Sequence, residues 1–305
     1  MSLRVLACGP LCLLQDAGRQ GWQHLGVSPA GPVDRQAAAW ANRLLGNAAG
    51  SALLEVALGG LTLEAEVDTW LALTGADLPA TLDGVVLPGW SRFRLRAGQS
   101  LRLGFARAGQ RAYLAVAGGF QVTPVLGSIS TQRREGLGGL TGDGRALAEG
   151  DRLLCAARGD AFRHAASVPW PYRPDYRAVP TLRLLPGPDA LEATAQAALF
   201  AQPWRISPQS DRMGVRLRGT ALAAPHRQWS LGVVEGAVQL PPDGQPIVLL
   251  ADRQSMGGYP LIGVVHPLDL GRLAQCPAHA EVRFVAGSVE AAQAEWRRFR
   301  QFFGA

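Results

Sequence analysis

Short apolar runs that stop at glycine, proline or aspartate constrain the fold of this 305-residue chain more than any other feature. The chain has 37 glycines and 21 prolines, which indicates many turns between short strands. Short strands in such a rhythm are typical of β-barrels and β-sandwiches, so we expect a mainly β chain. The runs predicted to form strands are 69–75, 92–106, 111–119, 152–157, 181–187, 246–252 and 280–287.

Helical patterns are few. Residues 34–45 carry alanine and leucine side chains on one side and are followed by Gly46, a common residue just after a helix. Residues 189–200 are rich in alanine, and residues 288–303 start at Ser288, a favourable N-cap. The aromatic side chains of this last segment recur at helical spacing, which favours packing over a cofactor site.

A proline-rich segment at 162–180 without clear periodicity predicts a connection between two domains. The length of the chain permits two ordinary domains, each with a core of its own. We therefore expect an N-terminal domain at 1–170 and a C-terminal domain at 171–305. A faint similarity between residues 15–21 and 209–214 leaves an internal duplication open.

The sequence contains no lysine, so all 30 cationic side chains are arginine. This excludes a lysine Schiff base and a P-loop lysine, and neither GxGxxG nor HExxH occurs. The net charge of +6 and the pI of about 9.7 invite a nucleic-acid interpretation. Because the arginines are spread along the chain, a generally basic surface that attracts anionic substrates is the better interpretation.

The four cysteines lack the spacing of a metal site and are typical of a reducing compartment. No run of 18 apolar residues predicts a membrane span. We expect a cytoplasmic protein that binds no metal, no membrane and no nucleic acid.

The segment 235–260, EGAVQLPPDGQPIVLLADRQSMGGYP, is the strongest candidate site. Its apolar run 247–251 predicts a buried strand, and polar side chains crowd the loops at both ends, as in many binding sites. Glutamine amides both donate and accept hydrogen bonds, which suits recognition of an amide or lactam. Asp252 could act as a base or orient Arg253. The alternative is two β-turns with solvated side chains.

A second candidate group comprises Asp16, Arg19, Asp34 and Arg35, with His24 between them. Arginine presents a planar fork suited to a carboxylate or a phosphate, and aspartate can orient that fork. The alternative is an internal ion-pair network that fixes a long loop to its domain.

The chain contains, in this order, QDAGRQGWQHLGVSPAGPVDR (15–35), ANRLLGN (41–47), ALLEVALGG (52–60), LTGADLPATLDG (73–84), YLAVAGGF (113–120), LGSIST (126–131), PQSDRMGVRL (208–217) and the segment 235–260. Together these segments resemble the C-subunit family of biotin-dependent carboxyltransferases, also called allophanate hydrolase subunit 2. Two residues after the Asp-Arg-Gln of the candidate site, Ser255 and Met256, depart from a usual Thr pair, and Leu261 replaces a common lysine.

The resemblance implies a fold of two linked cyclophilin-like β-barrels with a few short helices. It implies a subunit of an ATP-dependent 5-oxoprolinase complex, which opens the 5-oxoproline lactam to glutamate together with a B-subunit-like protein and an A-subunit-like hydrolase. ATP, with Mg²⁺, would be a co-substrate that could be held by a partner subunit, and this chain would carry no biotin. The alternatives are the carboxyltransferase component of a biotin-dependent urea or amide carboxylase, and a regulatory subunit that binds a kinase-inhibitor-like partner.

With this resemblance we assign Asp252, Arg253 and Asp16 as catalytic candidates. We expect both groups to face one groove, or a partner subunit, and Arg253→Ala to reduce the activity of the complex while sparing the fold. The substrate-binding candidates are Arg19, Asp34, Ser210, Arg212, Gln239, Asp243, Gln245, Gln254 and Tyr259.

Overall fold

The computed structural model describes residues 1–304 and divides the chain into two compact units. The first unit comprises residues 1–20 and 30–175 and the residues from 301 onward. The second comprises residues 21–29 and 176–300. The main division lies inside the proline-rich segment 162–180. The domain limits 1–170 and 171–305 stay predictions.

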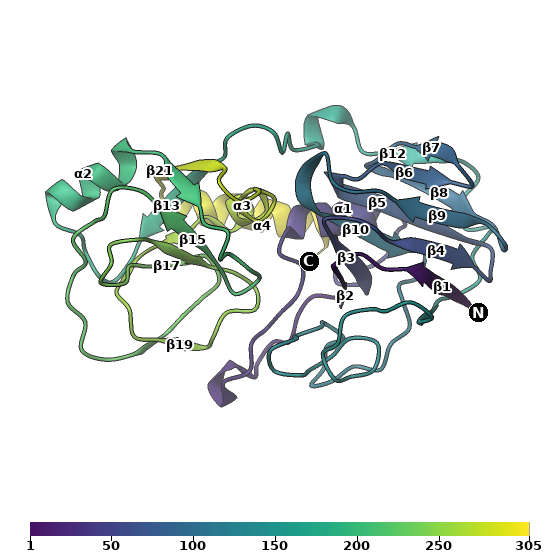
Figure 1. The fold of residues 1–305 in the computed structure, drawn as a ribbon, viewed down its shortest axis with the longest axis horizontal. Helices are drawn as coiled ribbons and strands as arrows, with labels where there is room; N and C mark the ends of the chain where they lie inside the picture. Colours follow the sequence, from purple (N-terminus) through teal and green to yellow (C-terminus); the bar gives the residue numbers. More distant parts are fainter. Residues whose placement is uncertain (305) are drawn as a thin grey trace. The chain divides into compact units, whose positions relative to one another are not determined.

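The first unit consists of two six-stranded sheets. Its strands are β1 (Ser2–Ala7), β2 (Leu11–Gln15), β3 (Leu53–Ala57), β4 (Thr62–Ala65), β5 (Thr69–Asp77), β6 (Ala80–Leu82), β7 (Val85–Leu87), β8 (Ser91–Leu95), β9 (Ser100–Leu103), β10 (Ala108–Val116), β11 (Arg152–Leu154) and β12 (Ala166–Ser167). The strand orders are β11-β1-β4-β9-β6-β7 and β12-β8-β5-β10-β3-β2, and many of these strands can be followed in Figure 1.

The core of this unit lies between the two sheets. On β9, Leu101 and Leu103 are buried while Arg102 is exposed, the alternation expected of a strand with one solvated face. Strand β5 is instead buried along nearly its whole length, because helix α1 (Arg35–Leu44) packs on its outer face. The Thr74 hydroxyl of β5 donates to the Ala37 carbonyl of α1 at 2.7 Å.

The second unit is a closed seven-stranded barrel. The strands of this unit are β13 (Thr181–Pro186), β14 (Trp204–Ile206), β15 (Gly214–Arg218), β16 (Leu231–Gly232), β17 (Ala237–Gln239), β18 (Ile247–Leu249), β19 (Met256–Gly257), β20 (Leu261–Val265) and β21 (Glu281–Ala286). The barrel order is β13-β20-β17-β18-β15-β14-β21, and β16 pairs separately with β19. Trp204, Val238 and Phe284 are among its fully or almost fully buried side chains. The expected mainly β chain with few helices is confirmed.

Three further helices are α2 (Ala193–Ala201), α3 (Pro267–Ala274) and α4 (Val289–Phe303). Helix α3 was not predicted from the sequence, although His266 and Pro267 signal its start. The His266 Nδ1 accepts from the backbone N–H of Leu268 at 3.1 Å, and proline at the first helical position gives up no needed hydrogen bond. Two 3₁₀ turns occur at Gln23–Leu25 and Trp170–Tyr172. Within residues 1–304 no helix has the length and apolarity that a membrane span requires.

The run 92–106, expected as one strand, forms two. β8 and β9 belong to different sheets and are separated by a turn that contains Gly98. Gly98 has φ +82°, a conformation that residues with a Cβ rarely adopt. The positive φ of this glycine therefore ends one strand and lets the next begin in the other sheet.

Candidate functional site

Two cavities of about 290 and 170 Å³ lie on the second unit and share Arg216, Ile247 and Tyr259 in their walls. We call them together the barrel groove. Strand β15 supplies one side of the groove: Val215 and Leu217 are buried, and Arg216 between them is exposed. The period of two along a strand therefore places the Arg216 side chain outside the barrel.

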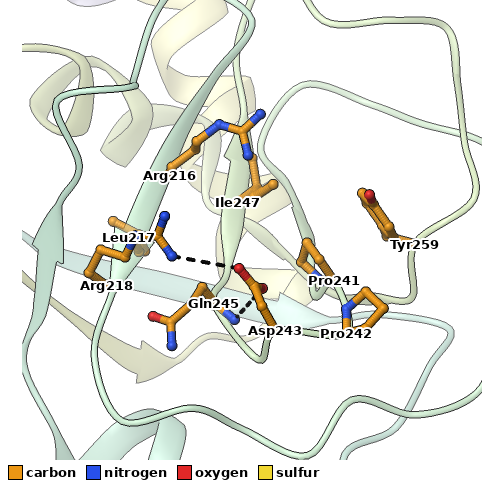
Figure 2. Close-up of a pocket in the computed structure, with 9 residues that line it drawn as sticks. All are labelled: Arg216, Leu217, Arg218, Pro241, Pro242, Asp243, Gln245, Ile247 and Tyr259. Carbon is orange, nitrogen blue, oxygen red and sulfur yellow. Dashed lines mark hydrogen bonds and ion pairs between the residues drawn. The ribbon is translucent and has the colours of Figure 1, made fainter.

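The larger cavity holds the predicted residues Asp243 and Gln245, and both are already bonded within the protein. Asp243 pairs with Arg218 at 3.6 Å and accepts from the Gln245 backbone N–H at 3.1 Å. The Gln245 side chain accepts from the Gly219 N–H at 2.9 Å and donates to the Gly219 carbonyl at 3.1 Å. Figure 2 shows the contacts of Asp243 with Arg218 and Gln245. These residues therefore close the 241–246 loop against the end of β15.

Arg216 is the exception among the charged side chains of the barrel groove. No dashed line reaches it in Figure 2, and within residues 1–304 its guanidinium has no hydrogen-bond or ion-pair partner. Its backbone is anchored, because the Arg216 N–H donates to Ser210 Oγ at 3.0 Å. Ser210, a predicted substrate-binding residue, thus fixes the strand from which Arg216 projects.

The smaller cavity is lined by three of the predicted substrate-binding residues, Gln239, Gln254 and Tyr259. Gln239 is the last residue of β17 and only 2% exposed. Its Oε1 lies 3.5 Å from Gln254 Nε2, whereas its own Nε2 has no hydrogen-bond partner among the described residues. A buried amide without a partner costs about 1–3 kcal/mol, so this donor is available for a ligand carbonyl or a water.

Gly257 lets the Gln239 amide occupy this place. A Cβ on Gly257 would lie 2.2 Å from Gln239 Nε2. The glycine has no positive φ, so space, and not backbone conformation, requires it here.

The predicted catalytic residues Asp252 and Arg253 line neither cavity of the barrel groove. Asp252 and Arg212 form a bidentate ion pair with two contacts of 2.9 Å, and both residues are buried. Arg253 is also buried, and its Nε donates to the Val233 carbonyl at 3.3 Å. These contacts hold the loop that carries Gln254.

Asp16 and Arg19 of the second candidate group lie in the first unit and are also engaged within the protein, whereas His24 belongs to the second unit. Asp16 accepts from Ser128 Oγ at 2.5 Å, from Ser130 Oγ at 2.7 Å and from the Ile129 N–H at 2.9 Å. Arg19 is fully buried and donates to the carbonyls of Ser128 and Ser130. The group therefore ties the 125–131 loop to the end of β2. That it faces the barrel groove stays a prediction.

Asp34 has a different local role. It caps α1 by accepting from the Ala37 N–H at 3.0 Å, and its own N–H donates to the Tyr113 hydroxyl at 2.8 Å. The same hydroxyl donates to Glu55 Oε2 at 2.9 Å. Burial, followed by the nearby Glu55 carboxylate, raises the pKa of Tyr113 well above its ordinary value, so the phenol stays a neutral donor.

Replacing Asp16 by alanine separates a structural role from a catalytic one. We expect Asp16→Ala to lower the free energy of unfolding by about 1–3 kcal/mol, because the hydroxyls and N–H groups it binds lose a charged acceptor. Urea unfolding measures this, with Asp160→Ala, an exposed aspartate of the same unit, as the control. Unchanged stability together with lost turnover would instead support the catalytic assignment.

Arg216 was not predicted from the sequence, although a signal was present. In GVRLR (214–218) the alternation of apolar and charged residues indicates that both arginines of this short strand face outward. No group of three or more potential metal-ligating side chains is found within residues 1–304.

Known proteins resemble this chain over nearly its whole length. A family model described as "Carboxyltransferase domain, subdomain A and B" matches residues 25–286. The chain is 41% identical to the C subunit of 5-oxoprolinase from Escherichia coli, covering 98% of this chain and 97% of that protein. It is 37% identical to the C subunit of 5-oxoprolinase from Haemophilus influenzae, covering 95% and 92%.

The chain spans only part of the solved structures that it matches. One crystal structure, at 37% identity and a TM-score of 0.84, matches 93% of this chain but 55% of its own length. Kluyveromyces lactis urea carboxylase, at 27% identity and a TM-score of 0.88, matches 98% of this chain and 29% of its own length.

Proposed function

The chain belongs to the carboxyltransferase domain family, subdomains A and B, and from that premise we propose that it is a subunit of an ATP-dependent 5-oxoprolinase complex that opens the 5-oxoproline lactam to glutamate. The observation that carries this proposal is the end-to-end match with the 5-oxoprolinase C subunit from Escherichia coli, 98% of one chain against 97% of the other. Against the urea carboxylase the chain is equivalent to 29% of a much longer protein.

The barrel groove supports the proposal because its free groups match a lactam. A lactam has one carbonyl acceptor and one N–H donor. Gln239 Nε2 is a buried donor without a partner among residues 1–304, and the Gln254 amide beside it can donate and accept. The smaller cavity, at 170 Å³, is comparable with the roughly 150 Å³ cavity that takes up benzene, so it has room for a small ring.

We assign the buried residues Arg212, Asp252 and Arg253, which line neither cavity of the groove, to positioning. Arg212, Asp252 and Arg253 fix the loop that presents Gln254, and Gln245 with Asp243 fixes the loop at the other end of β18. Direct catalytic roles for Asp252, Arg253 and Asp16 remain predictions that require mutagenesis. Because a 1 Å displacement of a binding group can cost about 100-fold in rate, positioning residues still affect turnover strongly.

We assign ATP and its Mg²⁺ to a partner subunit. A lactam is a stable amide, and phosphorylation of its carbonyl oxygen would prepare the ring carbon for attack by water. This chain has no lysine and no P-loop with which to hold a triphosphate. The relation to 5-oxoprolinase C subunits supports a B-subunit-like protein and an A-subunit-like hydrolase as its partners, and we propose that the complex acts in the cytoplasm.

The second candidate function is the carboxyltransferase step of a biotin-dependent carboxylase. The likeness to Kluyveromyces lactis urea carboxylase favours it. Biotin is carried on a lysine, so a chain without lysine would need a separate biotin carrier. A regulatory subunit that binds a kinase-inhibitor-like partner is the candidate from another class.

Reconstitution tests the proposed function. We expect the purified chain alone to release little or no phosphate from ATP. The complex with the A-subunit-like and B-subunit-like proteins should convert 5-oxoproline, ATP and water to glutamate, ADP and phosphate. Omitting each component in turn is the control. ATP-dependent turnover by this chain alone, or carboxylation that requires an added biotin carrier, would contradict the proposal.

A further inference from the structure

Arg216 differs from its neighbours on the second unit because no carboxylate among residues 1–304 forms an ion pair with it. Arg212 is paired with Asp252 at 2.9 Å, and Arg218 with Asp243 at 3.6 Å. Within residues 1–304 the Arg216 guanidinium has no partner, and its backbone is fixed by Ser210. An arginine whose backbone is fixed and whose guanidinium is unpaired can bind an anionic ligand without first breaking an ion pair with a protein carboxylate.

Arg216 also lies where a ligand of the groove would meet it. It lines both cavities, and it shares the smaller one with Gln239 and Gln254. The smaller cavity also contains an acidic side chain, Asp211. Its carboxylate accepts hydrogen bonds from the backbone N–H groups of Met213 and Gly214, at 2.8 and 3.3 Å. Among the described residues, a ligand therefore finds a free cation and a free amide donor in the same cavity.

We propose that Arg216 is the residue that binds the substrate carboxylate, and that it makes this site select anionic lactams over neutral ones. The inference rests on the proposed function. In 5-oxoproline the carboxylate and the lactam carbonyl flank the ring N–H. The carbonyl accepts from Gln239 Nε2, and the carboxylate meets the planar fork of Arg216, which can donate two parallel hydrogen bonds.

The predicted effect is a loss of affinity for one chemical feature of the substrate. In Arg216→Met the KM for 5-oxoproline rises roughly 10- to 100-fold, the range for one charge-assisted contact, while kcat changes little. The KM for ATP stays at its wild-type value. For 2-pyrrolidinone, the same ring without the carboxylate, the variant and the wild type behave alike.

Two further variants make the result specific. Arg216→Lys keeps the charge and loses the fork, so it restores part of the affinity. Arg102→Met, which removes an exposed strand arginine of the first unit, leaves both KM values unchanged. Melting temperatures of all three variants show that the fold is retained, as expected for exposed side chains.

Calorimetric binding of 5-oxoproline to the complex, without ATP, separates this inference from the proposed function. Binding that is weakened by Arg216→Met in a complex without 5-oxoprolinase turnover would reject the function and support the carboxylate site. Turnover with an unchanged KM in Arg216→Met, an equal loss for 2-pyrrolidinone, or a raised KM for ATP would overturn the inference. A wild-type complex that neither binds nor converts 5-oxoproline would overturn both.

Discussion

Replacing Asp252 by alanine is expected to lower the free energy of unfolding by about 3–5 kcal/mol, the largest loss of stability we predict for this chain. The substitution leaves the Arg212 guanidinium buried without the carboxylate that contacts it twice at 2.9 Å. A buried charge that loses its counterion keeps the cost of desolvation and loses the stabilisation that the carboxylate supplied. Urea or thermal unfolding of the purified chain measures the difference.

The exposed pair Arg218–Asp243 supplies a matched control. Asp243→Ala removes the same group from a solvated pair, whose loss typically costs at most about 1 kcal/mol. The double variant Arg212→Met with Asp252→Leu should recover most of the stability, because it removes both charges together. Asp252→Ala with unchanged stability and abolished turnover would contradict the structural role and favour Asp252 as a catalytic group.

Substituting Gly257 by alanine is expected to reduce turnover of the complex about 100-fold with little change in secondary structure. The new Cβ would stand 2.2 Å from Gln239 Nε2, so the amide must move out of the smaller cavity. Displacement of a binding group by about 1 Å can have an effect of this size on rate. Steady-state kinetics with 5-oxoproline, together with circular dichroism, measures both quantities.

Gly258→Ala is the control for this substitution. A Cβ on Gly258 would meet only Ser230 Oγ, at 3.4 Å, which is an ordinary contact. The two variants change adjacent residues in the same way, and only one of them displaces Gln239. Near-normal turnover in Gly257→Ala, or an equal loss in Gly258→Ala, would contradict a role for the Gln239 amide in the site.

Local patterns in the sequence predicted much of the secondary structure. Short apolar runs that end at turn residues found β5, β10, β13 and β21, and capping signals found α1 and α4. The pattern of apolar residues did not predict the places where a single residue changes the direction of the chain. Gly98 divides the run 92–106 between two sheets. The short helix α3 begins after a cap at His266, and its eight residues are too few to show a clear helical periodicity.

The sequence also predicted several of the groove residues as site residues, because Gln239, Gln254 and Tyr259 belong to one polar segment around a buried strand. It could not rank them against Asp252 and Arg253, which are equally polar and lie in the same loop. Hydrogen bonding separates the two sets: Arg253 donates to the Val233 carbonyl and Asp252 pairs with Arg212, whereas Gln239 keeps one donor without a partner among residues 1–304. Partners distant in sequence, such as Arg212 for Asp252, decide this.

By itself, the sequence determined the β-rich class and the segment that carries the candidate site, because strand periodicity and turn chemistry are local properties of the chain. It indicated the family through the resemblance of several segments, not through periodicity. The tertiary structure alone decided which charges are neutralised. Arg212, Arg216 and Arg218 stand within one short stretch, yet only closure of the barrel sets Asp252 against the first and Asp243 against the third, and leaves the second unpaired within residues 1–304. Pairing depends on distances across strands, and those distances exist only after the chain has folded.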